Sequence, residues 1–217
     1  MIQSPSSIGT FKTCPRQYEA KYITKEVVFM PTEHTIYGTR VHNALEVAIK
    51  GKQALDEEFS HLQPVVNACN DMPGTKYAET KYAVMVDGSY THYSDKTALV
   101  RCIVDLVVID GDVAMVIDWK TGKVKADDLQ LRINVVCIFA AFPRVNTVKT
   151  AFAYTKTGDL QAYKHDRKNT LEMLASITHD IEGVRQAEEN NQFKPTPSGL
   201  CKAWCDVTAC KYNGKKS

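Results

Sequence analysis

The chain has 217 residues, of which 44% are hydrophobic and 24% are charged, and its formal net charge is +2. This balance is typical of a globular protein and excludes a disordered, collagen-like or coiled-coil chain. No apolar run reaches the roughly 20 residues of a membrane-spanning helix, and the N-terminal Met1-Ile2-Gln3-Ser4-Pro5 lacks the layout of a secretion signal. We therefore expect a cytoplasmic protein of one domain that makes no membrane contact.

The first third of the chain has helical patterning. Ser4 followed by Pro5 is typical of a helix start, and the Cys14-Pro15 pair is expected to interrupt that helix. Gly51 is typical of a helix end. The helices expected from these signals and from the apolar periodicity span residues 4–23, 35–50 and 54–70.

The next segment has β character, with one helix inserted. The predicted strands span residues 77–86, 98–109, 113–119, 147–154 and 160–163, and the inserted helix spans residues 127–142. The strands at 98–109 and 113–119 are almost continuously apolar, so we expect central strands covered on both faces. Asp166 is predicted to cap a last helix that reaches about Asn191. This order predicts an α/β or α+β fold.

Two acidic residues and a lysine interrupt the apolar central strands. Asp118 and Lys120 lie on the same face of one strand because side chains alternate along it, and the turn at 110–112 can bring Asp105 beside Asp118. Burying such charges is unfavourable unless something compensates for them, and a divalent cation such as Mg²⁺ or Mn²⁺ would do so. The alternative is a structural set of ion pairs among the same three side chains.

These residues resemble the PD-(D/E)xK nuclease motif in its RecB-like form. Asp105 and the run Asp118-Trp119-Lys120-Thr121-Gly122 match its central part. Four further pieces occur in the family's order: Ser4-Pro5-Ser6-Ser7 with Cys14-Pro15-Arg16-Gln17-Tyr18, Gly38-Thr39-Arg40-Val41-His42, Gln130-Leu131, and three C-terminal cysteines. The resemblance spans residues 4–213 and is closest to small phage exonucleases and CRISPR-associated RecB-like nucleases.

The resemblance implies a restriction-endonuclease-like core, a central mixed sheet flanked by helices, with the termini tied by a metal cluster. One nuclease domain would then cover residues 1–217. Its parts would be N-terminal helices at 4–70, a catalytic core at 77–165, and a C-terminal helix with a cysteine clasp at 166–213.

The resemblance also implies roles for single residues. The metal would be held by the side chains of His42, Asp105 and Asp118 and by the backbone carbonyl of Trp119. Lys120 would position the attacking water and stabilise charge on the phosphate, and Gln130 would order the site or the DNA backbone. Phosphodiester hydrolysis needs a nucleophilic water and neutralised charge, which a metal and an ammonium supply.

Three positions leave alternatives open. His42 shares a helical face with Leu45, so its pattern alone is equally that of a packed residue. Glu79, on the first predicted strand, either joins the metal site or faces solvent. Asn134 stands four residues after Gln130, where the family's motif usually carries a tyrosine.

The chain has seven cysteines. The resemblance implies that Cys14, Cys201, Cys205 and Cys210 hold a [4Fe–4S] cluster, although the spacing of the last three is three and four residues where the family has two and five. The alternatives are a zinc site or reduced free thiols. The other three are expected to be buried apolar residues: Cys69, Cys102 and Cys137.

The expected partner is DNA, as single strands or as ends. Arg16, Lys123 and Lys125 are expected to hold phosphates without reading sequence, although scattered basic residues are equally typical of a solvated surface. The sequence has no G-x-x-x-x-G-K-[ST] phosphate loop, so a helicase or recombination partner would be a separate protein.

We therefore expect a metal-dependent DNA exonuclease that acts in viral or cellular recombination, repair or degradation, within a bacterial host if a phage encodes it. The first alternative is a CRISPR-type spacer-trimming nuclease. The second is a DNA-end-binding or assembly factor that uses the same fold without hydrolysis. The third is an iron–sulfur redox sensor.

Overall fold

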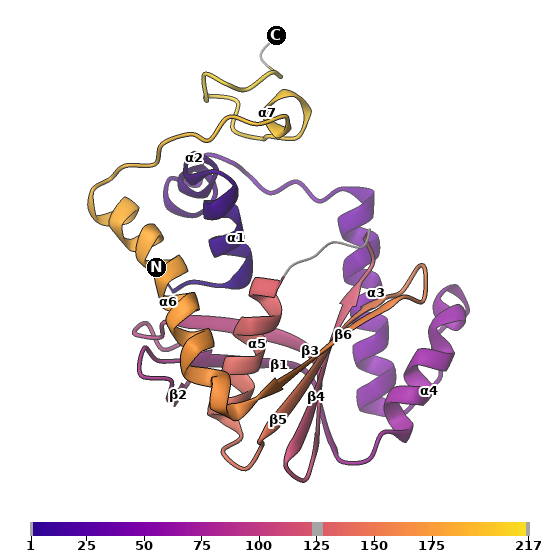
Figure 1. Ribbon diagram of the computed structural model, residues 1–217. Coiled ribbons are helices and arrows are strands. Elements are labelled where there is room, and N and C mark those ends of the chain that lie inside the picture. Colours follow the sequence, from indigo (N-terminus) through magenta and orange to yellow (C-terminus); the bar gives the residue numbers. More distant parts are fainter. Residues whose placement is uncertain (1, 123–127, 216–217) are drawn as a thin grey trace.

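A six-stranded sheet lies at the middle of the molecule (Figure 1). The structure, a computed structural model, describes residues 2–122 and 128–215. The strands are β1 (Thr75–Val84), β2 (Tyr90–Thr91), β3 (Val100–Asp110), β4 (Val113–Lys120), β5 (Thr147–Tyr154) and β6 (Leu160–Asp166), in the order β2-β1-β3-β4-β5-β6. β4 and β5 run parallel and the other neighbours antiparallel, so the sheet is mixed, as predicted.

Helices cover both faces of the sheet. They are α1 (Pro5–Thr13), α2 (Pro15–Tyr18), the π-helical turn η1 (Glu19–Ile23), α3 (Glu33–Gly51), the 3₁₀ helix η2 (Glu57–Leu62), α4 (Gln63–Asp71), α5 (Asp128–Ala141), the 3₁₀ turn η3 (Arg167–Asn169), α6 (Thr170–Glu189) and α7 (Leu200–Ala203). α3 and α4 lie on one face, and α5 and α6 lie on the other (Figure 1). This arrangement confirms the predicted fold class.

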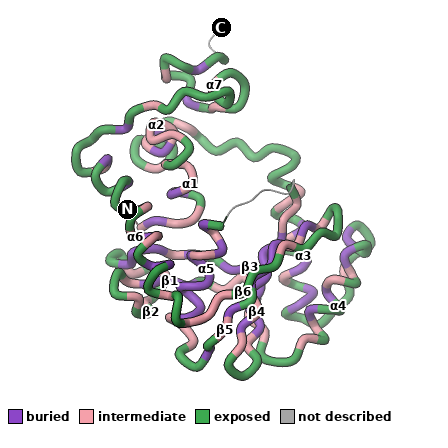
Figure 2. The backbone as a smooth tube through the Cα atoms, viewed as in Figure 1, coloured by how far each residue is buried: buried purple, intermediate pink, exposed green. Residues whose placement is uncertain are grey.

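Apolar side chains on the two faces of the sheet form two separate cores. Val116 of β4 belongs to the core beneath α5 and α6, whereas Ile117 belongs to the core beneath α3 and α4. This alternation follows from the period of two along a strand. Buried residues are accordingly concentrated in the central strands and in the helix surfaces that face them (Figure 2). β3 and β4 are therefore central strands covered on both faces, as predicted.

The first helices follow their sequence signals. Ser4 caps α1, since its side chain accepts the Ser7 N–H at 3.2 Å while its own N–H donates to Ser7 Oγ at 2.8 Å. Cys14 has an extended backbone and separates α1 from α2, which confirms the predicted break before Pro15.

Two predicted helix starts are wrong. The segment expected to be helical from residue 54 begins as the 3₁₀ helix η2, and α4 starts only at Gln63, where Pro64 occupies a first-turn position that needs no N–H. Asp166 does not cap the last helix. It still pairs with Thr147 at the end of β6, so that α6 begins at Thr170.

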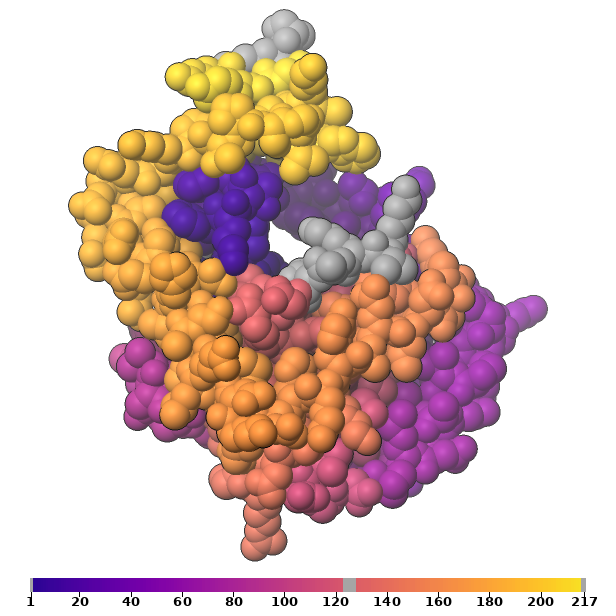
Figure 3. Space-filling view, viewed as in Figure 1, coloured from indigo at the N-terminus to yellow at the C-terminus, as the bar shows by residue number. Residues whose placement is uncertain are grey.

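The C-terminal tail packs over the N-terminal helices (Figures 1 and 3). The Thr196 N–H lies 3.4 Å from Cys14 Sγ. Asn213 closes the tail on itself, because its amide donates to the carbonyls of Cys205 and Val207 at 3.0 and 3.1 Å. The segment that leads into the tail thus contacts the N-terminal region at the Cys14 thiol.

The predicted [4Fe–4S] clasp is not supported. Cys14, Cys201, Cys205 and Cys210 are free thiols, and within the described residues they do not form a group of metal-ligating atoms. The four sulfurs are not gathered around one point, and two of them, those of Cys14 and Cys201, instead lie near the backbone N–H groups of Thr196 and Ser198. The remaining cysteines are buried, as predicted.

None of the helices in the described part of the chain combines the length and apolar character that a bilayer crossing requires.

Candidate active site

β1 and β3 are distorted at the point where two carboxylates meet. Their antiparallel ladder pairs Ala78 with Leu106 and Thr80 with Val104 but skips Glu79 and Asp105. Glu79 has a φ of +49°, a left-handed conformation that non-glycine residues rarely adopt. Val104 and Leu106 also belong to opposite cores, although residues two apart on a regular strand share a face. The distortion therefore frees both carboxylates from the regular pleat.

β3 and β4 separate at the same level. The last pair of their ladder is Leu106 with Ile117. Beyond it, Asp105 Oδ2 accepts a hydrogen bond from the Trp119 N–H at 2.7 Å. The N–H and C=O of one strand residue point to the same side, so the Trp119 carbonyl is also directed into the gap between the two strands. The Lys120 carbonyl points the other way, toward β5, where it accepts the Thr155 N–H at 2.9 Å.

His42 on α3 completes a group of three ligands. Its Nδ1 lies 3.3 Å from Asp105 Oδ1 and 3.8 Å from Glu79 Oε1. One ligand atom from each of these three residues lies within 4.8 Å of the others. α3 approaches the end of β4 closely one turn earlier, where a Cβ on Gly38 would lie 3.0 Å from Thr121 Oγ1. The helix thus delivers its histidine to the gap in the sheet.

The surroundings of His42 favour a positive charge. Burial disfavours the imidazolium, but the neighbouring carboxylates of Asp105 and Glu79 outweigh burial and raise the pKa of His42 to about 10. The carboxylates of Asp105 and Glu79, with ligand atoms within 4.8 Å of each other, would repel without such a cation. The three side chains therefore favour a positive charge at the point where they meet.

Asp118, Lys120 and Gln130 form a second, connected group. Asp118 is 3% exposed, and its Oδ2 lies 2.6 Å from Lys120 Nζ. Lys120 Nζ donates to Gln130 Oε1 at 2.8 Å, and the Gln130 amide donates to Asp118 Oδ1. Burial, together with the charge of Asp105, raises the pKa of Asp118 to about 6 against the opposing charge of Lys120. Gln130 therefore holds both charged groups in place from α5.

The residues in the gap fit a divalent cation. Asp118 Oδ2 is buried, and within the described chain it has no well-aligned hydrogen-bond donor, only the neighbouring ammonium of Lys120. Glu79 and Asp105 provide further carboxylate oxygens, and His42 provides an imidazole nitrogen. Oxygen-rich sets of this kind suit hard divalent metals.

The structure brings seven predicted site residues to this gap: His42, Glu79, Asp105, Asp118, Trp119, Lys120 and Gln130. It does not bring Asn134 to the surface. That side chain is 1% exposed, and in the described part of the chain neither of its amide atoms has a hydrogen-bond partner.

Of the three residues predicted to contact DNA, the structure describes Arg16 alone. The Arg16 guanidinium forms ion pairs with Glu19, at 3.1 Å, and with Glu26. Lys123 and Lys125 lie outside the described residues. DNA contact by these three residues stays a prediction.

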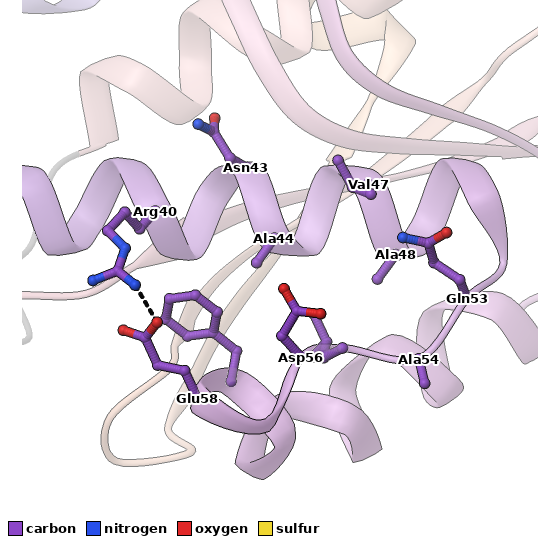
Figure 4. Close-up of a pocket in the computed structure, with 11 residues that line it drawn as sticks. Arg40, Asn43, Ala44, Val47, Ala48, Gln53, Ala54, Asp56 and Glu58 are labelled. Carbon is purple, nitrogen blue, oxygen red and sulfur yellow. Dashed lines mark hydrogen bonds and ion pairs between the residues drawn. The ribbon is translucent and has the colours of Figure 1, made fainter.

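A separate cavity of about 330 Å³ lies between α3 and the segment that follows it (Figure 4). Arg40 lines it, forms an ion pair with Glu58 and lies 5.6 Å from the centroid of the Phe59 ring. His42 and the carboxylates of the gap are not among the residues that line it. This cavity is therefore distinct from the candidate active site.

Comparisons with known proteins agree with this geometry. The PD-(D/E)XK nuclease superfamily matches residues 3–210. A candidate exonuclease from Eubacterium rectale superposes with a TM-score of 0.55 at 12% identity, over 92% of this chain and 85% of that chain. The protein SSO0001 superposes with a TM-score of 0.50 at 17% identity, over 97% and 86%. No curated protein matches the chain.

The two solved structures show the fold, and the family match shows the class. The family is one of hydrolytic nucleases. The chain belongs to the PD-(D/E)xK nuclease superfamily, which confirms the resemblance at that level.

Proposed function

We propose that the whole chain acts as one metal-dependent deoxyribonuclease domain that hydrolyses phosphodiester bonds from DNA ends. The observation that carries the proposal is the gap between β3 and β4, where Asp105, Asp118 and Lys120 meet His42 and Glu79. A purely structural set of ion pairs would not require Glu79 to adopt a strained backbone beside a second carboxylate.

Four side chains and one carbonyl would hold Mg²⁺ or Mn²⁺ in this gap: His42, Glu79, Asp105, Asp118 and the carbonyl of Trp119. Bound there, such a cation supplies an activated water and neutralises charge on the phosphate. Asp105 is already oriented for this role, because the Trp119 N–H holds its second oxygen at 2.7 Å.

Lys120 acts on the reacting phosphate. Hydrolysis joins a water oxygen to phosphorus and breaks the bond from phosphorus to a sugar oxygen, so negative charge grows on the phosphate oxygens in the transition state. The ammonium of Lys120 is fixed by Asp118 and Gln130, and its side chain is 30% exposed, which leaves it within reach of a bound strand. A positive charge fixed in advance stabilises that transition state without reorganisation.

The end-directed mode and the biological setting are parts of the proposal. The Eubacterium rectale neighbour is named as a candidate exonuclease, which supports action from the ends of a nucleic acid. The proposed setting is recombination, repair or degradation of DNA. Any helicase or recombination partner would be a separate protein.

The proposal is tested with linear, end-labelled DNA and covalently closed circles of the same sequence, each with Mg²⁺, Mn²⁺ or EDTA. We expect metal-dependent loss of nucleotides from the linear DNA, intact circles, and no cleavage by Asp118→Asn. Asp112→Asn, in the exposed turn between β3 and β4, is the matched control and should cleave as the wild type does.

Two results would contradict the proposal. Cutting of the circles would show an endonuclease. Binding of DNA ends without cleavage at every metal concentration would favour a non-hydrolytic end-binding factor.

A further inference from the structure

A cationic cluster lies beside the candidate active site on the same two strands. Tyr93 belongs to the loop between β2 and β3, and two cations lie over its ring. Lys81 Nζ is 5.5 Å and Arg101 Cζ is 4.8 Å from the ring centroid. Within the described residues, neither Lys81 nor Arg101 has a carboxylate partner at ion-pair distance. We call Lys81, Tyr93 and Arg101 the cationic strip.

The strand register connects the cationic strip to the carboxylates. Lys81 lies opposite Ile103, two residues along β1 from Glu79, and Arg101 lies four residues along β3 from Asp105. Arg101 and Ile103 share one face of β3, and the four residues of strand from Arg101 to Asp105 span about 13 Å. Ile103, between them, is 41% exposed. β3 therefore presents an exposed residue between the strip and the catalytic gap.

The loop that carries Tyr93 is held in shape by Asp95. The Asp95 carboxylate accepts hydrogen bonds from Thr91 Oγ1 at 2.5 Å, from Thr97 Oγ1 at 2.6 Å and from the Thr97 N–H at 2.9 Å. This Asx-type arrangement fixes the loop on both sides of its tip. The aromatic ring is thus placed in advance and does not depend on a bound molecule for its position.

The charge arrangement calls for an anionic partner. Lys81 and Arg101 are diagonal neighbours across the ladder, and like charges on neighbouring strand positions repel each other. Attraction to the electron-rich face of Tyr93 offsets part of this repulsion. A polyanion laid along the strip would offset the rest and would release its counterions, which favours binding.

We propose that Lys81, Tyr93 and Arg101 bind the phosphate backbone of the DNA strand on one side of the cleavage point. The inference rests on the proposed nuclease function and names the surface that guides the substrate to it. Such contacts position a strand and carry no sequence information, which suits an enzyme that degrades DNA of any sequence.

The test compares two double variants, each of which removes two cations. Lys81→Ala/Arg101→Ala removes them from the strip. Lys149→Ala/Lys164→Ala removes a cross-strand pair from β5 and β6, and serves as the matched control. Binding of fluorescein-labelled DNA is measured by anisotropy in EDTA, so that no cleavage occurs, over a series of salt concentrations. Circular dichroism melting checks that each variant folds.

For the strip variant we expect about a tenfold or greater loss of affinity. The slope of log affinity against log salt should fall by about 1.8 for duplex DNA or about 1.4 for single strands, which is two phosphate contacts in either case. The control variant should keep the wild-type affinity and slope. In cleavage assays the strip variant should raise KM and leave kcat nearly unchanged.

Substitutions of Tyr93 provide an independent test of DNA binding by the strip. Tyr93→Phe keeps the ring and should keep affinity, whereas Tyr93→Leu should lose part of it. If the alanine double variant does not fold, Lys81→Gln/Arg101→Gln removes the charges while keeping similar side-chain length.

The outcomes separate the two proposals. A strip variant that folds and binds DNA with wild-type affinity and salt slope overturns the inference, while metal-dependent cleavage by the wild type still supports the function. A wild type that binds DNA but never cleaves it overturns the function, and the salt slopes then still decide whether the strip holds phosphate.

Discussion

Asp118 and Lys120 stand two residues apart on β4, and their charged groups meet at 2.6 Å while Gln130 bridges both. The ammonium is also 4.7 Å from the centroid of the Phe152 ring. Lys120 is thus held by a carboxylate, an amide and an aromatic face, and its position does not depend on substrate. This arrangement makes Lys120 a positioned charge rather than a mobile surface lysine.

Removal of that charge should slow the chemical step. We expect Lys120→Ala to lower the single-turnover cleavage rate by about 100- to 1,000-fold, the loss typical of a charge-stabilising donor, while DNA affinity stays near that of the wild type. Gln130→Ala should lower the rate less, because Lys120 keeps its pair with Asp118. A Lys120→Ala enzyme with the wild-type rate would remove Lys120 from the mechanism.

We expect Glu79 to lower the stability of the metal-free protein while it contributes to metal binding. Its φ of +49° is unfavourable for a side chain but free of strain for glycine. Glu79→Gly should therefore raise the free energy of unfolding of the metal-free protein by about 1 kcal/mol. The same variant should bind Mn²⁺ more weakly. Urea unfolding in EDTA measures the first effect, and a less stable variant would show that the strain is not stored at this residue.

Arg167 should be a structural residue. Its guanidinium donates to the carbonyls of Phe139, Phe142 and Val145 at 3.0, 2.7 and 2.6 Å. These hydrogen bonds satisfy backbone carbonyls at the end of α5 and in the turn after it. Because hydrogen bonds from a charged donor are strong, we expect Arg167→Ala to cost on the order of 3 kcal/mol. That loss corresponds to a drop in Tm of roughly 6–12 °C for a chain of this size.

The control for this prediction is Arg144→Ala, which removes an exposed arginine near the same turn. It should melt within about 2 °C of the wild type. Equal melting of both variants would show that the three carbonyl contacts add nothing to stability.

Asp95 should make stability depend on pH in the acid range. The hydrogen bond from Thr91, followed by those from Thr97, lowers the pKa of Asp95 from 3.8 to about 2. A carboxyl whose pKa is lower in the folded state stabilises the fold fully above its unfolded pKa and loses that contribution as pH falls through its folded pKa. Asp95→Asn should thus be less stable than the wild type at pH 7, and the difference should shrink between about pH 4 and pH 2. Melting curves across this range measure it, and a difference that stays constant would contradict the assignment.

Part of the site could be predicted from local rules. Strand alternation placed Asp118 and Lys120 on one face, and the short turn after β3 brought Asp105 to the same level. Spacing alone did not assign His42, because a histidine on an amphipathic helix has the pattern of a packed residue. Its place in the prediction came from the family resemblance.

Other features depend on contacts that no local pattern contains. The left-handed backbone of Glu79 occurs at a residue with ordinary strand neighbours, and it arises where two strands distort together. The cationic strip was missed because Lys81 and Arg101 lie on different strands. They become neighbours only through the pairing register of β1 and β3. The signal that could have found the strip was one basic residue near each predicted carboxylate, Lys81 two residues after Glu79 and Arg101 four residues before Asp105. Asp166 was predicted to cap the last helix because Asp is a common capping residue. Asp also occurs at the ends of strands, and Asp166 ends β6.

The central claim is that the gap between β3 and β4 binds a divalent metal through His42, Asp105 and Asp118. Its most direct test is a Mn²⁺ titration followed by electron paramagnetic resonance, with the wild type beside His42→Ala/Asp105→Asn/Asp118→Asn and with Asp110→Asn/Asp112→Asn as a control that also removes two acidic charges. We predict saturable binding by the wild type and the control and loss of that binding in the site variant. Equal Mn²⁺ binding by all three proteins would contradict the account.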